Sequence, residues 1–182
     1  MKKYLYCLLV GLSFALATTA QITKATLQAS GLTCALCAKA VYSNLSSLPF
    51  VDSIDTDLNA SAFVIAFKKG MIVDIDALNK KVQDAGFSIA SLLVSAHITP
   101  GKIELDKHIT IGQQVFHFLN VKSQDVASEI TFKLVDQAFV SAKEFKKVIT
   151  LTKMQCVKTG RAESCCAADG IKESTRIFHA II

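Results

Sequence analysis

The sequence predicts an α+β protein made of two parts, and three observations support that prediction. Apolar residues over roughly 23–94 change between strand and helix spacing in the order β-α-β-β-α-β. A proline followed by glycine in "SAHITPGK", residues 95–102, indicates a turn or linker. The rest of the chain consists of strand-like runs separated by polar turns, with one short helical pattern. We therefore expect domains at 21–95 and 102–182, joined by a linker at 96–101.

The first twenty residues have the features of a secretory signal peptide. Lys2 and Lys3 precede the apolar run "YLYCLLVGLSFALA", and small residues come before Gln21. This run is too short to predict a stable membrane anchor. We therefore expect residues 1–20 to be a signal peptide and the mature protein to be secreted, with the periplasm as the favoured location.

Removing residues 1–20 changes both the net charge and the number of cysteines. The net charge falls from +5 to about +3, because two lysines leave and no acidic residue does. So small a charge gives no reason to expect a nucleic-acid partner. Five cysteines remain, and an odd number in a secreted protein leaves at least one thiol outside internal disulfides. These cysteines are Cys34, Cys37, Cys156, Cys165 and Cys166.

The N-terminal part alternates short strands with two amphipathic helices. Pro49 closes the first helix, while Asp74 can cap the second helix and Gly86 ends it. Two β-α-β units of this length predict a four-stranded antiparallel sheet with both helices on one face, the ferredoxin-like fold. The strands are expected at 25–30, 51–58, 61–67 and 87–94, and the helices at 37–48 and 75–85.

The C-terminal part is expected to be a small, mostly β domain that could close into a barrel. Its single predicted helix, at 141–149, begins with the capping box of Ser141 and Glu144. The segment 152–175 has the composition of a loop and carries three cysteines. The phenylalanines expected in the core are Phe116, Phe118, Phe132 and Phe139. The expected strands are 102–106, 108–111, 114–121, 129–135 and 176–182.

Cys34 and Cys37 lie where the first strand gives way to the first helix, in "GLTCALCAKAVYSNL", residues 31–45. Unpaired N–H groups at a helix start favour negative charge, so a thiol there becomes a thiolate more readily. Two thiolates with no His, Asp or Glu between them form a soft site of low coordination. Such a site suits Cu(I), whereas Zn(II) would need further ligands. Gly31 allows the loop to bend tightly.

The same stretch resembles a known metal-binding loop. "GLTCALC" is similar to the GMTCxxC loop of the heavy-metal-associated domain, the module of copper chaperones, metal-pumping ATPase tails and the periplasmic mercury-binding protein. "AVYSNLSSLPFV" resembles the first helix of that family, and "IDALNKKVQDAGF" resembles its second helix and the Gly-aromatic pair that follows. The resemblance covers residues 23–94. It implies that Cys34 and Cys37 are metal ligands and that Phe87 packs under the loop.

Two residues of the loop bear on which ion it would bind. Leu32 stands where the family usually has a buried methionine, and leucine can replace that side chain in packing. Thr33 precedes the first cysteine, as in the copper and mercury versions of the domain rather than the zinc-selective ones. The resemblance therefore favours Cu(I), with Hg(II) and Zn(II) as other thiophilic ions. Gly31, Leu32, Thr33 and Phe87 are expected to support the loop.

Two other interpretations of Cys34 and Cys37 remain open. In an oxidising compartment the pair could be a structural disulfide. It could also be a redox motif of the thioredoxin type, which likewise opens a helix after a strand. The β-α-β-β-α-β order and the absence of tryptophan argue against redox catalysis, and Pro100 lies in the expected linker rather than before a later strand. Metal binding by unoxidised thiols is the preferred interpretation.

The distal cysteines Cys156, Cys165 and Cys166 allow several interpretations. One is a loop-stapling disulfide from Cys156 to Cys165 or Cys166, which leaves a spare thiol. Another is a second soft-metal site formed by the three thiolates. His117 and His179 lie mid-strand between apolar neighbours, where structural histidines are common; pairing of their strands would favour metal binding instead. His97 and His108 are expected in turns.

The sequence therefore predicts an exported heavy-metal-binding protein that buffers an ion or transfers it to a partner. A metal-transporting ATPase, an efflux component or another metal-accepting protein would be such a partner. The alternative is a periplasmic thiol–disulfide protein that uses the same two cysteines. No nucleophile–base pair or cofactor loop is visible in the sequence, so no enzymatic activity is expected.

Overall fold

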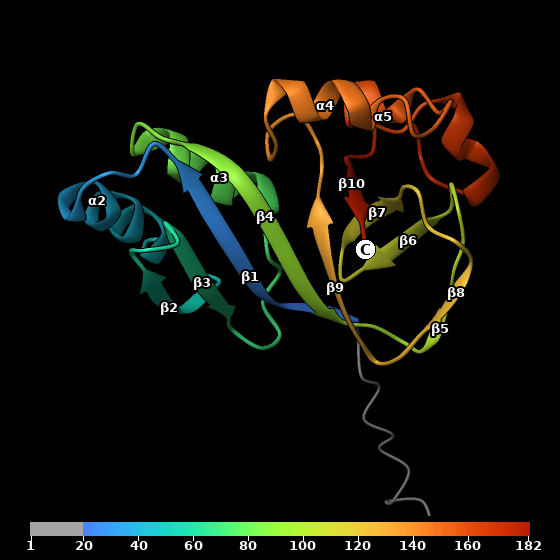
Figure 1. Ribbon diagram of the computed structural model, residues 1–182. Helices are drawn as coiled ribbons and strands as arrows, with labels where there is room; N and C mark the ends of the chain where they lie inside the picture. The colour runs from blue at the N-terminus through green and yellow to red at the C-terminus, as the bar shows by residue number, and fades with distance from the viewer. Residues whose placement is uncertain (1–19) are drawn as a thin grey trace, which may run out of the picture.

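The computed structural model describes residues 20–182, and the predicted signal peptide therefore lies almost wholly outside the described residues. Ten strands, four α-helices and one 3-10 helix follow one another in these residues (Figure 1). In the N-terminal part they are β1 (Gln21–Ser30), α2 (Ala35–Ser46), β2 (Val51–Asp57), β3 (Ala62–Phe67), α3 (Ile75–Asp84) and β4 (Ser88–His97). In the C-terminal part they are β5 (Gly101–Ile103), β6 (His108–Ile111), β7 (Gln114–Phe118), β8 (Gln124–Val126), β9 (Glu129–Leu134), α4 (Ala142–Val148), α5 (Cys156–Thr159), η1 (Ser164–Asp169) and β10 (Ile177–Ile181).

The N-terminal part has the predicted ferredoxin-like fold. Its strands lie in the order β2-β3-β1-β4, and each neighbouring pair is antiparallel. The helices α2 and α3 contact each other and bury their apolar residues in the same core as the strands. Asp74 caps α3 as expected, because its carboxylate accepts a hydrogen bond from the Ala77 N–H at 3.0 Å. The sequence therefore predicted this half of the fold correctly.

One continuous sheet joins the two parts of the chain. β4 pairs with β9 over six residues, from Leu92 opposite Leu134 to His97 opposite Glu129. The full order is β2-β3-β1-β4-β9-β10-β7-β6, and the long twist of this sheet is visible in Figure 1. Within the expected linker, residues 96 and 97 continue β4, and Gly101 opens β5. The two parts therefore share backbone hydrogen bonds.

The C-terminal part is mostly β, as predicted, but the described sheet is open rather than closed into a barrel. β2 and β6 form its two edges, while β5 and β8 make a separate two-stranded sheet. α4 begins at the predicted cap Ser141, whose side chain accepts from the Glu144 N–H at 3.2 Å. The segment 152–175, expected to be a loop, contains the short helices α5 and η1. Such short helices contain too few turns to produce a periodic pattern in the sequence.

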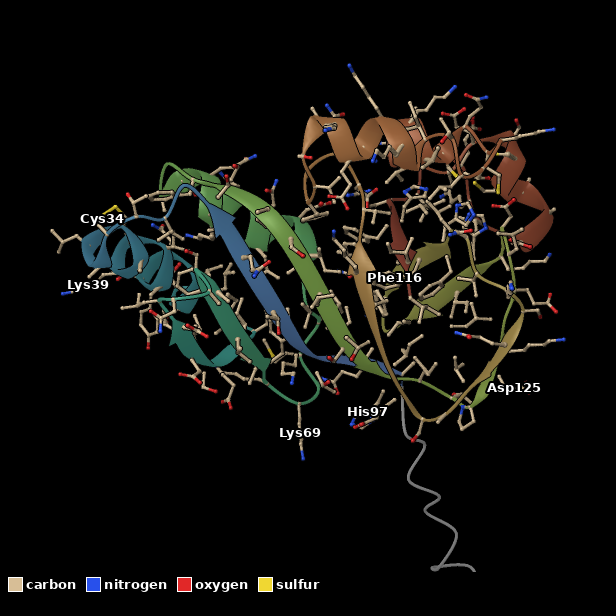
Figure 2. The ribbon with its side chains drawn as sticks, viewed as in Figure 1. Cys34, Lys39, Lys69, His97, Phe116 and Asp125 are labelled. Atoms are coloured by element: carbon tan, nitrogen blue, oxygen red, sulfur yellow. A yellow bond between two sulfur atoms is a disulfide. The ribbon has the colours of Figure 1, made fainter. Side chains whose placement is uncertain are left out.

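Phenylalanines fill the core beneath the C-terminal strands. The rings of Phe116 and Phe132 meet edge to face with centroids 5.1 Å apart, and the rings of Phe116 and Phe178 lie 5.7 Å apart. All three side chains are buried, and Figure 2 labels Phe116 inside this region. The core position predicted for Phe116 and Phe132 is confirmed, and so is that of Phe118 and Phe139, which are also buried. Within residues 20–182 no helix has the length and apolar character needed to cross a membrane.

Candidate metal centres

Cys34 and Cys37 lie at the mouth of α2, as the sequence predicted. Cys34 is the N-cap residue, and its sulfur accepts a hydrogen bond from the Cys37 N–H at 3.1 Å. This contact satisfies one of the N–H groups that have no partner inside the helix. Cys34 is exposed and Cys37 is half-buried. Figure 2 shows Cys34 at the outer end of the molecule, away from the C-terminal part, where an incoming molecule could reach it.

The two sulfur atoms are joined in a disulfide, with Cα atoms 5.2 Å apart. This corrects the expectation of unoxidised thiols, because bonded sulfurs have no thiolate to offer a metal ion. Cys34 and Cys37 are one helical turn apart, which is close enough for both to bind one ion. The same spacing lets their sulfurs bond to each other. The structure thus represents the oxidised form, and any metal binding here requires reduction first.

The residues expected to support the loop differ in what they contact. Gly31 has a φ of +80°, a left-handed conformation that glycine adopts without the steric clash of a Cβ atom. Leu32 packs against the main core, and its carbonyl accepts a hydrogen bond from the Ser61 hydroxyl at 3.3 Å. Phe87 also packs against this core, and it lies next to Ser88, which pairs with Ser30 at the start of the loop. Thr33 is exposed.

The three distal cysteines are all free thiols, so the loop-stapling disulfide expected as one alternative is absent among the described residues. Cys156 opens α5 and is fully buried, while Cys165 and Cys166 lie in η1 with their sulfurs 3.7 Å apart. Burial is the largest influence on Cys156 and Cys166 and raises the pKa of both thiols. These thiols are therefore protonated at neutral pH unless a cation displaces the proton.

Three histidines line up beside Cys156 on adjacent strands. His117 of β7 pairs in register with His179 of β10 on one side and with His108 of β6 on the other. The ring centroids of His108 and His117 are 4.9 Å apart, and those of His117 and His179 are 5.3 Å apart. The Sγ of Cys156 lies 3.7 Å from the Nδ1 of His117. Residues in register project to the same face of a sheet, so the three rings form one row.

Burial and the neighbouring rings keep His117 uncharged. Loss of contact with water has the largest effect on the pKa of His117, and the nearby rings of His179 and His108 have smaller effects in the same direction. Together they lower the pKa of His117 to about 4. The carboxylate of Asp106, 3.1 Å from the Nε2 of His117, opposes the shift without reversing it. A neutral imidazole keeps a lone pair on one nitrogen, which is the form that binds metal ions.

The potential ligands form two overlapping groups that share Cys156. One contains His108, Cys156 and Cys166, and the other contains His117, Cys156 and His179; within each group the ligand atoms lie within 4.8 Å of one another. Cys165 is in neither group. The sequence named Cys156 and Cys166 as possible ligands, and it named His117 and His179 on the condition that their strands pair, as β7 and β10 do. It missed His108, which was expected in a turn and in fact begins β6.

Comparison with known proteins supports the assignment of the N-terminal part. Residues 26–88 match the family model of the heavy-metal-associated domain, which confirms the resemblance and supports heavy-metal binding by this part of the chain. The match does not extend into the C-terminal part. No match to the chain is found among curated proteins.

Several solved structures resemble the same region. The yeast copper transporter domain Ccc2a is 22% identical, with 37% of this chain and 90% of that chain covered and a TM-score of 0.33. CopP of Helicobacter pylori in its apo form is 24% identical, with coverage of 37% and 98% and a TM-score of 0.33. Oxidised MerP of Ralstonia metallidurans is 26% identical, with coverage of 39% and 97% and a TM-score of 0.33.

Proposed function

We propose that the protein is an exported metal-binding protein that binds Cu(I) through Cys34 and Cys37 once their disulfide is reduced. The observation that supports this most is the position of the pair. Both sulfurs lie at the start of α2 on an exposed loop, within a domain that matches the heavy-metal-associated family. Reduction would give two thiolates beside unpaired helix N–H groups, and two soft ligands suit Cu(I).

An exposed, two-coordinate site favours transfer as well as storage. An incoming thiolate from a partner could add to the ion before one of the two cysteines leaves, so the ion need never be released to water. The exposed Leu36, between the two cysteines, and a hollow of about 130 Å³ beside Cys34 are surface features that a partner could contact. A metal-transporting ATPase, an efflux component or another metal-accepting protein is the proposed recipient.

A competition titration tests this function. Fully reduced protein is titrated with Cu(I) against a chromogenic Cu(I) chelator, in a Cys156→Ser background that removes the shared sulfur of the distal cluster. We expect one equivalent to bind, with affinity falling more than about 1,000-fold when Cys34→Ser and Cys37→Ser are added, because both proposed ligands are lost. Cys165→Ser is the matched control and should change nothing. An equal affinity for Cu(I) in proteins with and without Cys34 and Cys37 would overturn the proposal.

A second candidate function is thiol–disulfide exchange, and the disulfide between Cys34 and Cys37 favours it. A helix N-terminus stabilises the thiolate that attacks or leaves in such exchange. Insulin reduction separates the two functions. Turnover of insulin by the reduced protein, without retention of Cu(I), would make exchange the primary activity, whereas Cu(I) retention without turnover supports metal binding.

A further inference from the structure

We propose that His117, His179 and Cys156 form a second metal site, buried in the C-terminal part, that holds Zn²⁺ in a structural role, with His108 moving in as the fourth ligand. Cys166 lies close enough to replace or join one of these ligands. The site is distinct from Cys34 and Cys37 in position, ligand type and exposure, and it does not depend on the function proposed for that pair.

The arrangement of His117, His179 and Cys156 fits three of the four positions around a tetrahedral ion, and His108 lies near the shared sulfur. Zn²⁺ binds imidazole nitrogen at about 2.0–2.1 Å and thiolate sulfur at about 2.3 Å, so the two ligand atoms should be about 3.6 Å apart. The distance between the Nδ1 of His117 and the Sγ of Cys156 is 3.7 Å. The other potential ligand atoms lie within 4.8 Å of the shared sulfur. Small side-chain movements would therefore complete the coordination.

Each histidine is oriented by a carboxylate on the side away from the cluster. Asp169 is 2.8 Å from the Nδ1 of His108, and Asp136 is 2.8 Å from the Nδ1 of His179. With such a carboxylate the adjacent ring nitrogen carries the proton, and the opposite nitrogen keeps its lone pair. The same logic applies to His117, whose Nε2 faces Asp106 and whose Nδ1 faces Cys156. Metal-binding histidines commonly have this kind of partner.

Two of the remaining ring nitrogens have no hydrogen-bond partner among residues 20–182. The Nε2 atoms of His108 and His179 are buried without a hydrogen bond, and their side chains are fully shielded from solvent. Buried polar atoms are nearly always satisfied in native proteins, and an unsatisfied one needs an explanation such as an ion. Here two such nitrogens lie on one row of histidines beside a buried thiol. A metal ion held by His117, His179 and Cys156 would satisfy the Nε2 of His179, and movement of His108 toward the same ion would satisfy the other nitrogen.

Asp169 and Asp136 each have a cationic partner as well as a histidine. Asp169 is paired with Lys107 at 2.8 Å, and Asp136 is paired with Arg176 at 3.3 Å. Each carboxylate that orients a histidine is therefore itself held in place by a second contact. Binding of Zn²⁺ would displace the proton of Cys156 to solvent, so that the ion is held by one thiolate and three neutral imidazoles.

The ligand set and the burial indicate Zn²⁺ and a structural role. Mixed imidazole and thiolate ligands suit a borderline ion such as Zn²⁺, in contrast to the all-sulfur pair at α2. His117, His179 and Cys156 are fully buried, which leaves no open position for a substrate. The ion would tie β6, β7 and β10 to α5, elements that are far apart in the sequence.

Cobalt substitution of the full chain tests the site. Reduced Cys34→Ser/Cys37→Ser protein, from which the first pair has been removed, is loaded with Zn²⁺ or Co²⁺. We expect one Zn²⁺ per chain, together with the intense visible bands of tetrahedral Co²⁺ and a thiolate-to-cobalt charge-transfer band. Cys156→Ser should abolish the charge-transfer band and weaken Zn²⁺ binding more than about 100-fold, whereas Cys165→Ser should leave both unchanged.

A milder variant keeps the proposal testable even if the Cys156→Ser protein does not fold. Asp169→Asn, on the outer side of His108, should weaken Zn²⁺ binding by about 10- to 100-fold while the far-UV circular dichroism stays the same. Failure of the folded Cys34→Ser/Cys37→Ser protein to bind Zn²⁺ would overturn the proposal. Unchanged Zn²⁺ affinity in both Cys156→Ser and Asp169→Asn would also overturn it. Neither result would affect Cu(I) binding at Cys34 and Cys37.

Discussion

Reduced protein is expected to bind Cu(I) at the α2 loop more than about 1,000-fold more tightly than the same protein with Cys34 and Cys37 joined, a difference of about 4 kcal/mol. The reason is that a disulfide offers no thiolate, so oxidation removes both ligands in a single step. The measurement is Cu(I) competition on two samples of the Cys156→Ser variant, one reduced and one oxidised. Mass spectrometry after alkylation establishes the thiol state of each sample.

The matched control for this comparison is the Cys34→Ser/Cys37→Ser protein in the same background, which cannot form the disulfide. Its Cu(I) affinity should be low and should not respond to reductant. If oxidised and reduced samples bind Cu(I) equally, the pair is not the binding site. If Cu(I) binding depends on reduction of the pair, the thiol–disulfide redox potential of the compartment would control how much Cu(I) the protein binds.

The second large effect is expected at Asp136, which connects β9 to the histidine row. Its buried carboxylate accepts hydrogen bonds from the backbone N–H of His179 at 2.9 Å and lies 2.8 Å from the Nδ1 of the same residue. Asp136→Ala leaves both donors buried without a partner and should lower the free energy of unfolding by about 3 kcal/mol. Urea unfolding in the presence of a metal chelator measures this loss without any contribution from bound Zn²⁺.

Asp76 provides a matched control for Asp136, because both carboxylates pair with Arg176. Asp76 is half exposed and accepts from the guanidinium at 2.9 and 3.1 Å. An exposed ion pair contributes little, so Asp76→Ala should lower the free energy of unfolding by less than about 1 kcal/mol. If Asp136→Ala lowers the free energy of unfolding by no more than Asp76→Ala does, the contacts of Asp136 with His179 do not stabilise the fold.

The N-terminal part was predictable because its signals are local. Strand alternation, helical spacing and the caps at Asp74 and Gly86 all act within a few residues and agree with one another. The loop of Cys34 and Cys37 is equally local, so its place at the start of α2 could be predicted. Its oxidation state could not, because the same spacing serves both a two-thiolate site and a disulfide.

The histidine cluster could be predicted only as a condition, for His117 and His179, because it depends on strand pairing across long stretches of chain. His117 and His179 meet only because β10 inserts beside β7 in parallel, a pairing of residues 62 positions apart. Cys156 joins them from α5, a helix too short to leave a periodic signal. Pairing of this kind is decided by packing of the whole sheet rather than by local preference. The open shape of the sheet was missed for the same reason.

X-ray absorption at the copper K edge identifies the atoms bound to Cu(I) and so tests whether Cys34 and Cys37 are its ligands. The reduced Cys156→Ser protein is loaded with one equivalent of Cu(I), and the atoms around the ion are identified from the spectrum. Coordination by two sulfur atoms, lost when Cys34→Ser and Cys37→Ser are added, is the predicted result. Coordination by imidazole nitrogen, or a spectrum unaffected by loss of both cysteines, would contradict the account.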